Sequence, residues 1–123
     1  VAADYLENTA YERVGRLLDA DKKISAFFCC NDQMALGAMR RLHEMGCACP
    51  RDISIMGFDD EKDGQQSIPA LTTIHVPIYQ LARQAVALLI EHLQQDAIKT
   101  TLTGVIKEPV SLVERGSVAT IGV

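Results

Sequence analysis

The sequence predicts an α/β protein in which helices flank a parallel β-sheet. Two short apolar runs, Phe27–Cys30 and Ile53–Met56, are separated by a helical apolar pattern over residues 34–39. Strands that a helix joins in this order run parallel, so their carboxyl ends meet at one edge of the sheet. Asn31 and Asp59 follow those ends, and open α/β sheets bind their ligands at this edge. We therefore expect both side chains to face one crevice.

Composition and charge favour a folded domain and argue against direct DNA or membrane binding. Of 123 residues, 48% are apolar and 23% are charged, which is typical of a globular domain large enough to bury a core. Twelve basic and 16 acidic residues give a net charge of −4, so a DNA-binding or membrane-binding basic surface is not expected. No apolar run reaches the ~20 residues of a membrane span. The sequence starts at Val1 without a signal-peptide pattern, which suggests a piece of a longer protein.

The first helix and the first strand follow from the spacing of apolar residues. A helix over residues 6–20 is expected because its apolar side chains recur at helical intervals. These side chains belong to Tyr11, Val14, Leu17 and Leu18. Residues 24–30 form a nearly continuous apolar run, which is typical of a strand that is covered on both faces.

A second helix is expected over residues 32–45, with Asn31 as its N-cap and Gly46 as its C-terminal stop. Its core stripe consists of Ala35, Ala38, Met39, Leu42 and Met45. Met34 and Leu36 lie off this stripe, each about 100° from the stripe residue between them. Such a pair indicates a second contact surface, with ordinary scattered surface exposure as the alternative.

Prolines and polar segments delimit the remaining elements. Pro77 ends a run rich in β-branched residues, and Pro109 divides the last apolar segment. The longest helical pattern lies between these two prolines. In order, we expect a polar loop over 61–67, a strand over 71–76, a helix over 78–95, and short strands over 100–107 and 110–114.

The four cysteines favour a reducing compartment. Cys29 and Cys30 are adjacent in an expected strand, so their side chains point to opposite faces and do not pair easily. Cys47 and Cys49, with His43 one turn upstream, allow a metal site to be drawn, but no second ligand pair accompanies them. We expect no metal, and four small buried side chains instead.

The sequence contains no recognisable catalytic or cofactor motif. Glycine-rich nucleotide-binding loops, zinc-protease motifs and the nucleophile-elbow pattern are all missing. His43, His75 and His92 are isolated, without a sequence neighbour that would make a triad. We therefore expect neither an enzyme nor a bound cofactor.

Several separated motifs resemble, in the same order, the lactose/galactose repressor (LacI/GalR) family of transcription regulators. They are Asn31–Met39, Gly46, Pro50–Asp60, Pro69–Ile74 and Val113–Ser117. The resemblance covers nearly the whole chain. It implies a periplasmic-binding-protein-like domain of two α/β lobes, with a small effector held in the cleft between them.

The resemblance also implies how the chain is divided. Residues 1–73 would belong to the C-terminal lobe of the effector-binding domain. Residues 74–107 would supply a crossover strand, a helix of the other lobe and the return. Residues 108–123 would form the final strand of the C-terminal lobe and the tail. The N-terminal helix-turn-helix that binds operator DNA in this family has no counterpart in the sequence.

Three positions match the effector-binding residues of the family: Tyr5, Asn31 and Asp59. An aromatic ring suits the apolar face of a sugar, while an amide and a carboxylate suit its hydroxyl groups. The alternatives are ordinary packing for Tyr5, helix capping for Asn31 and satisfaction of loop amides for Asp59. Asp60 is expected to structure the loop.

The family resemblance places a dimer interface on the second helix and on the loop at 63–67. In this sequence the corresponding residues are Met34 and Leu36 on the helix, and Gln66 and Ser67 on the loop. The first two are the apolar pair that lies off the core stripe.

The expected function is the effector-binding and dimerisation portion of a cytoplasmic, sugar-responsive transcriptional repressor. Its partners would be a small-molecule effector, most simply a sugar or sugar phosphate, and a second copy of the chain. Operator DNA would be contacted only through the missing helix-turn-helix. The alternative is the C-terminal lobe of an extracytoplasmic sugar-binding protein of a transporter, against which the unpaired cysteines argue. The motifs do not rank a sugar above a purine.

Overall fold

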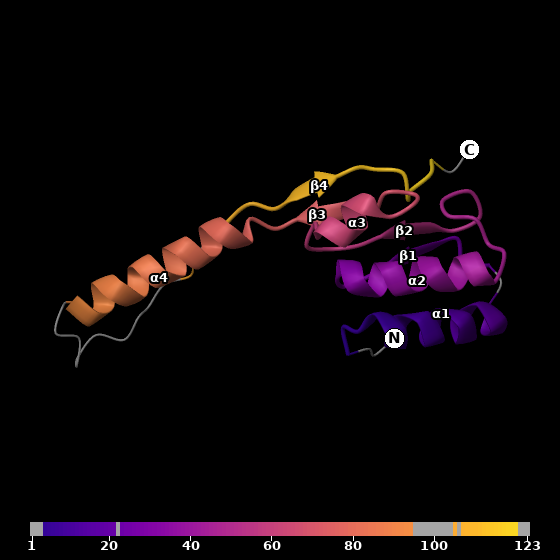
Figure 1. Cartoon of the computed structure of the whole chain (residues 1–123), viewed down its shortest axis with the longest axis horizontal. Helices are drawn as coiled ribbons and strands as arrows, with labels where there is room; N and C mark the ends of the chain where they lie inside the picture. The colour runs from indigo at the N-terminus through magenta and orange to yellow at the C-terminus, as the bar shows by residue number, and fades with distance from the viewer. Residues whose placement is uncertain (1–3, 22, 95–104, 106, 121–123) are drawn as a thin grey trace. The chain divides into compact units, whose positions relative to one another are not determined.

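The computed structural model describes residues 4–21, 23–94, 105 and 107–120 (Figure 1). The chain forms two compact units, one of Val1–His75 with Ser111–Val123 and one of Val76–Val110. The helices are α1 (Glu7–Ala20), α2 (Asp32–Glu44), α3 (Lys62–Gln66) and α4 (Ile78–Gln94). The strands are β1 (Ala26–Phe28), β2 (Ser54–Met56), β3 (Thr73–His75) and β4 (Ser111–Val113).

The first unit contains the expected parallel pair of strands. β1 and β2 run parallel, with Phe28 opposite Met56. Single parallel bridges then connect the β2 side to β3, at Met56 with Thr72 and at Asp59 with His75. β3 pairs antiparallel with β4. The predicted α/β class with a parallel sheet is therefore confirmed.

The two long helices of this unit lie side by side and share one core with the strands (Figure 1). The α2 stripe is buried as predicted, except that Met45 is only half-buried. The core consists of Val14, Leu18, Cys29, Ala35, Ala38, Met39, Leu42, Ile53, Ile55 and Leu71. Asn31 caps α2 by accepting a 2.9 Å hydrogen bond from the backbone N–H of Met34. Gly46 follows the helix with a φ of +74°, which glycine adopts without steric cost.

A glycine permits the close contact between α1 and α2. A Cβ atom added to Gly37 would lie 2.1 Å from the carbonyl oxygen of Glu7, at the start of α1. Gly15 faces the same interface from α1, but there an added Cβ would meet the guanidinium end of Arg41, which can move. The backbones at Gly37 therefore approach more closely than any larger residue allows.

The structure differs from the sequence expectations at several elements. The predicted loop over 61–67 contains the short helix α3, whose single buried residue, Gly64, gives no apolar periodicity. The apolar runs at 24–30 and 71–76 are longer than the strands within them, because only three residues of each are in the ladder. The predicted strand over 100–107 falls largely outside the described residues, and the described Val105 and Lys107 are not in a strand.

The four cysteines differ in burial, and the expectation of four buried side chains is right only for Cys29. Burial raises the pKa of the Cys29 thiol to about 12, because a thiolate is poorly solvated there. Cys30 is exposed, whereas Cys47 and Cys49 are half-buried, and all four are free thiols. Extended backbone sends adjacent side chains to opposite sides, so Cys30 leaves the core that Cys29 enters.

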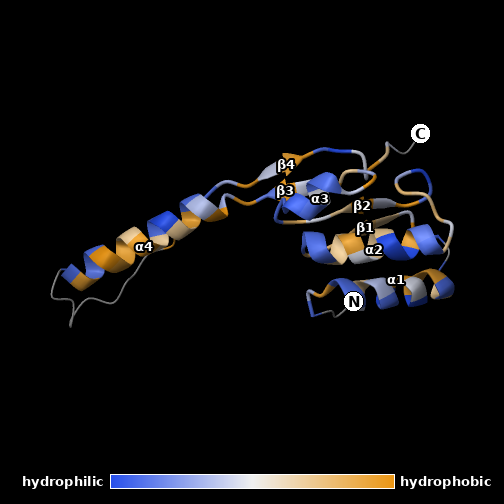
Figure 2. Cartoon of the chain, in the orientation of Figure 1, coloured by the Kyte–Doolittle hydropathy of each residue, from blue (hydrophilic) through white to orange (hydrophobic). Residues whose placement is uncertain are grey.

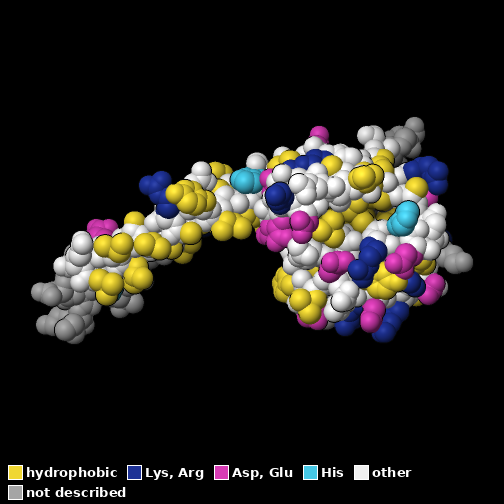
Figure 3. Space-filling model, viewed as in Figure 1, with side chains coloured by type: hydrophobic (Ala, Val, Ile, Leu, Met, Phe, Trp, Pro, Cys, Tyr) yellow, Lys and Arg dark blue, Asp and Glu magenta, His cyan; other side chains and the backbone are white. Residues whose placement is uncertain are grey.

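The second unit is dominated by α4, which has the predicted apolar pattern but no buried residue among those described. Much of this helix has the colour of hydrophobic residues in Figure 2, and hydrophobic side chains cover much of it in Figure 3. The large exposed ones are Ile78, Tyr79, Val86, Leu88, Leu89, Ile90 and Leu93. A bare apolar surface of this kind is typical of a helix that another element covers. None of the described helices combines the length and hydropathy that crossing a membrane requires.

Candidate functional site

The carboxyl edge of the parallel strands brings two predicted site residues together. Asn31 comes three residues after Phe28, the end of β1, and Asp59 comes three residues after Met56, the end of β2. Because Phe28 and Met56 are paired in the ladder, both residues lie at the same edge of the sheet. This is the edge at which open α/β sheets bind ligands.

The side chain of Asn31 connects the start of α2 with Tyr5. Its Oδ1 accepts the cap bond described above, and its Nδ2 donates to the carbonyl oxygen of Tyr5 at 3.1 Å. Tyr5 has a φ of +64°, a region that residues with side chains rarely occupy. Its side chain is not packed into the core, since Tyr5 is 62% exposed. Asn31 is therefore a helix cap, which is the alternative role considered for it in the sequence. It also holds the backbone of Tyr5, whose aromatic ring is exposed.

The carboxylate of Asp59 has no hydrogen-bond or ion-pair partner among the described residues. Its backbone N–H donates to the carbonyl oxygen of Ile74 at 2.9 Å, and its φ is +116°. Partial burial raises the pKa of Asp59, and the nearby carboxylates of Asp32 and Glu61 raise it further. An anion in these surroundings gains stability from any hydroxyl or N–H donor that a ligand offers.

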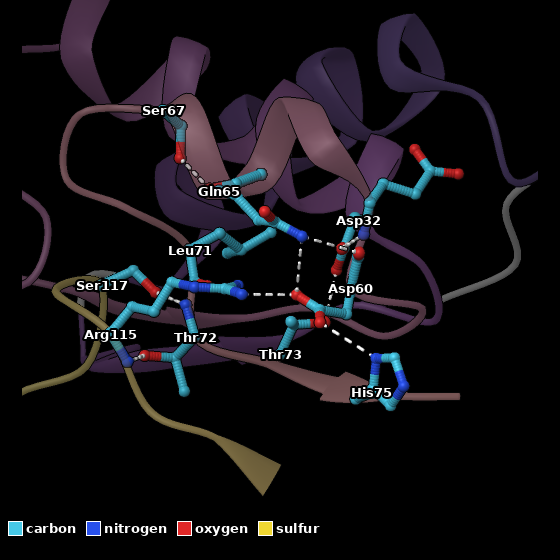
Figure 4. Close-up of polar contacts among 12 residues, drawn as sticks. Asp32, Asp60, Gln65, Ser67, Leu71, Thr72, Thr73, His75, Arg115 and Ser117 are labelled. Carbon is cyan, nitrogen blue, oxygen red and sulfur yellow. Dashed lines mark hydrogen bonds and ion pairs between the residues drawn. The ribbon is translucent and has the colours of Figure 1, made fainter. Parts of the chain in front are cut away.

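Asp32 supports the loop that carries Asp59. Its carboxylate is fully buried, accepting 2.7 Å and 2.6 Å bonds from the backbone N–H of Glu61 and the hydroxyl of Thr73 (Figure 4). Gly57 leaves room for it, because an added Cβ there would lie 2.2 Å from Asp32 Oδ1. Asp32 also lies in the first turn of α2, where a negative charge is favourable. No local sequence pattern reveals its two hydrogen bonds, because both donors are distant in the sequence.

Asp60 is the centre of a second polar cluster, drawn in Figure 4. Its carboxylate accepts from a guanidinium N–H of Arg115, lies 3.0 Å from Nδ1 of His75, and is also contacted by the amide of Gln65. Burial works to raise the pKa of Asp60, but the hydrogen bonds from Arg115 and His75 outweigh it and lower the pKa. Asp60 therefore structures the loop, as expected.

This cluster makes the stability of the first unit depend on pH. The pKa of Asp60 lies below the ~3.9 of an unfolded aspartate, so its stabilisation is complete above that value and is lost as the pH falls through the folded pKa. We expect Asp60→Asn to lower the thermal midpoint at pH 7, and the difference from wild type to shrink by pH 3. Midpoints of the full-length protein across this range measure it. Asp63→Asn, on the exposed side of α3, is the control, and a pH-independent difference would contradict the prediction.

The four predicted interface residues differ in exposure. Met34 and Leu36 are half-buried and pack against the core, so they are less exposed than their position off the stripe suggested. Gln66 is exposed, and the hydroxyl of Ser67 donates to two carbonyl groups of its own turn. The next residue, Ile68, is 97% exposed and was not singled out in the sequence. Their role in a dimer stays a prediction.

Metal binding has no evident site in the part of the chain that the structure describes. Within it, no group of three or more His, Cys, Asp or Glu side chains is arranged to hold a metal ion.

Comparisons with known proteins agree with this fold. The model of the periplasmic binding protein-like domain matches residues 2–118. The repressor PurR of Haemophilus influenzae is 47% identical over 83 residues, covering 68% of this chain and 25% of that protein. PurR of Pectobacterium carotovorum is 34% identical over 119 residues, covering 97% of this chain and 34% of that protein.

Solved structures of LacI-type regulators are similar over nearly the whole chain. The lac repressor dimer bound to operator and the anti-inducer ONPF matches with a TM-score of 0.82 and 34% identity, covering 94% of this chain and 39% of that one. A LacI family regulator from Enterococcus faecium with bound ribose matches with a TM-score of 0.81 and 30% identity, covering 94% and 42%.

The chain belongs to the periplasmic-binding-protein-like domain family. Within that family its relatives are LacI/GalR transcription regulators, and it forms part of the effector-binding domain, which confirms the resemblance seen in the sequence. The transporter alternative is not favoured, because these relatives are regulators. The chain spans 25% and 34% of the length of the two PurR relatives.

Proposed function

We propose that the full-length protein is a cytoplasmic transcriptional repressor that responds to a small polar effector, and that this chain supplies one wall of the effector site. The observation that carries the proposal is the Asp59 carboxylate, which lies at the ligand-binding edge of the sheet and has no partner among the described residues. In this proposal the second unit, Val76–Val110, belongs to the other lobe. Full-length copies form a dimer that contacts operator DNA through helix-turn-helix heads.

We assign the effector to the neutral sugars. The exposed ring of Tyr5 offers an apolar face, and the carboxylate of Asp59 accepts hydrogen bonds from hydroxyl groups. The structure of the Enterococcus faecium relative holds ribose. Asp32 and Glu61 surround Asp59 with negative charge, which disfavours a phosphate group at this edge. A neutral sugar is therefore preferred over the sugar phosphate that the sequence left equally open.

Effector binding regulates DNA binding if the effector prefers one closure state of the two lobes. The effector can shift the equilibrium only by its difference in affinity for the two states. Thermal-shift measurements on the full-length protein with ribose, ribose 5-phosphate, lactose and hypoxanthine identify the chemical class. Stabilisation by ribose 5-phosphate alone, or by hypoxanthine alone, would contradict the assignment to neutral sugars.

Asp59→Asn is expected to weaken effector binding by roughly 10-fold to 150-fold, because a hydrogen bond to a charged group contributes about 1.5–3 kcal/mol. The amide keeps the size of the side chain but loses the charge and one acceptor. Calorimetric titration of the full-length protein with the stabilising compound measures the dissociation constant. Asp63→Asn, a control on α3, should leave it unchanged. An Asp59→Asn dissociation constant within twofold of wild type would remove Asp59 from the site.

A further inference from the structure

The backbone that presents Asp59 is in an unfavourable conformation over two consecutive residues. The φ values of Asp59 and Asp60 are +116° and +65°, and neither residue is glycine. Residues with a Cβ atom avoid this region for steric reasons, so such a conformation persists only when surrounding contacts hold it. The contacts of these two residues therefore decide where the Asp59 carboxylate points.

The contacts that hold Asp60 come mainly from Arg115 and His75. Arg115 Nη2 donates to one carboxylate oxygen of Asp60, and His75 Nδ1 lies 3.0 Å from the other. The side chains of Arg115 and Asp60 are only 19% and 12% exposed, so water screens their attraction poorly. Charge-assisted bonds of this kind are stronger and more directional than bonds between neutral groups.

Arg115 is itself fixed to the chain at two further points. Its Nη1 donates to the carbonyl oxygen of Leu71 at 2.8 Å, and its backbone N–H donates to the hydroxyl of Thr72 at 2.9 Å (Figure 4). The guanidinium therefore forms a rigid cross-link between the segment that precedes β3 and the loop that follows β2. A lysine offers one charged centre and cannot make this planar two-sided contact.

Asp59 depends on that cross-link because its own contacts are few. Only its backbone N–H is held, by the carbonyl oxygen of Ile74, while its carboxylate has no partner in the described part of the chain. We infer that Arg115 is a positioning residue for effector binding: by fixing Asp60, it holds the backbone that directs the Asp59 carboxylate toward a ligand. The inference rests on the proposed role of Asp59 in binding.

The test compares Arg115→Met with Arg51→Met in the full-length protein. Arg51 also pairs with an aspartate, but its partner is the adjacent Asp52 and its side chain is 77% exposed, so it is a matched control. Hydrogen exchange followed by mass spectrometry reports on the Asp59 amide. We expect exchange at least fivefold faster in Arg115→Met and unchanged in Arg51→Met. Unchanged exchange in both variants would overturn the inference.

A second measurement reports on the carboxylate itself. Carbon-13 NMR of aspartate-labelled protein, with the Asp59 signal assigned by its loss in Asp59→Asn, gives the pKa of Asp59. We expect this pKa to fall toward the ordinary aspartate value in Arg115→Met, because a released loop exposes the Asp59 carboxylate to water and moves it away from Asp32. A loss of structure elsewhere in the protein would leave the pKa of Asp59 unchanged. An unchanged Asp59 pKa would overturn the inference.

Conservative and alternative variants complete the test. Arg115→Lys should give exchange rates between those of wild type and Arg115→Met, since it keeps the charge but loses the double contact. If Arg115→Met does not fold, Asp60→Asn takes its place and should accelerate exchange at Asp59 in the same way. The proposed function fails separately, when Asp59→Asn leaves effector affinity unchanged. The inference fails alone when Asp59→Asn weakens binding but Arg115→Met and Asp60→Asn leave the Asp59 backbone protected.

Discussion

Gly37→Ala is expected to destabilise the first unit by roughly 3 kcal/mol or more, although alanine is the better helix former. Helix propensity alone predicts a gain of about 1 kcal/mol from this substitution. The added methyl group, however, would lie 2.1 Å from the backbone oxygen of Glu7. A backbone atom cannot rotate away, so the two helices must separate and lose packing. The steric clash costs more than the gain in helix propensity, so the substitution lowers the free energy of unfolding.

The thermal midpoint of the full-length protein measures this effect, with a drop of roughly 6–12 °C expected from a loss of about 3 kcal/mol. Gly15→Ala is the matched control, because it adds the same methyl group to the same interface. There the neighbouring atoms belong to the flexible guanidinium of Arg41. The control should change the midpoint much less. Equal midpoints for wild type and Gly37→Ala would show that the helices are less closely packed than described.

Asp32→Ala is expected to have a comparable effect, a loss of about 3 kcal/mol. The substitution leaves the backbone N–H of Glu61 and the hydroxyl of Thr73 without their acceptor inside the protein. An unsatisfied buried polar group costs ~1–3 kcal/mol, and there are two of them. The loss of a negative charge from the first turn of α2 adds a smaller unfavourable change.

Asp32→Asn separates hydrogen bonding from charge at this position. Its amide oxygen can still accept from the Glu61 N–H, and its amide nitrogen can donate to the Thr73 hydroxyl, which also accepts hydrogen bonds. We therefore expect a clearly smaller loss than for Asp32→Ala in urea or thermal unfolding of the full-length protein. Equal losses for the two variants would show that the charge, and not the pair of hydrogen bonds, dominates.

The sequence predicted the elements whose signals are local. The α1 and α2 helices carry apolar residues at helical spacing, and a Gly46 stop and an Asn31 cap mark the limits of α2. The parallel pairing of β1 and β2 followed from the helix between them. The short helix α3 escaped prediction because it is almost wholly polar and buries one glycine.

The candidate site was predictable only in part, because only some of its residues have a local sequence signal. Asn31 and Asp59 were predicted because each is a polar residue that closely follows the end of an apolar run. The cluster around Asp60 was not found, because Arg115 lies 55 residues further along the chain. The left-handed conformations of Tyr5, Asp59 and Asp60 also carry no sequence signal, since glycine is the residue that usually marks them.

The order in which these contacts become possible has a consequence for synthesis on the ribosome. The hydroxyl of Ser117 accepts a hydrogen bond from the N–H of Thr72 and donates one to the carbonyl oxygen of Ile55. It therefore connects two segments of the first unit, although in the sequence it comes after Val76–Val110. Arg115 reaches Asp60 from the same late segment. A nascent chain must therefore emerge past the whole segment Val76–Val110 before the loop that carries Asp59 and Asp60 can be fixed. If the loop that carries Asp59 binds the effector as proposed, growing polypeptides that have not yet exposed these last residues would not bind it, whatever its concentration in the cell.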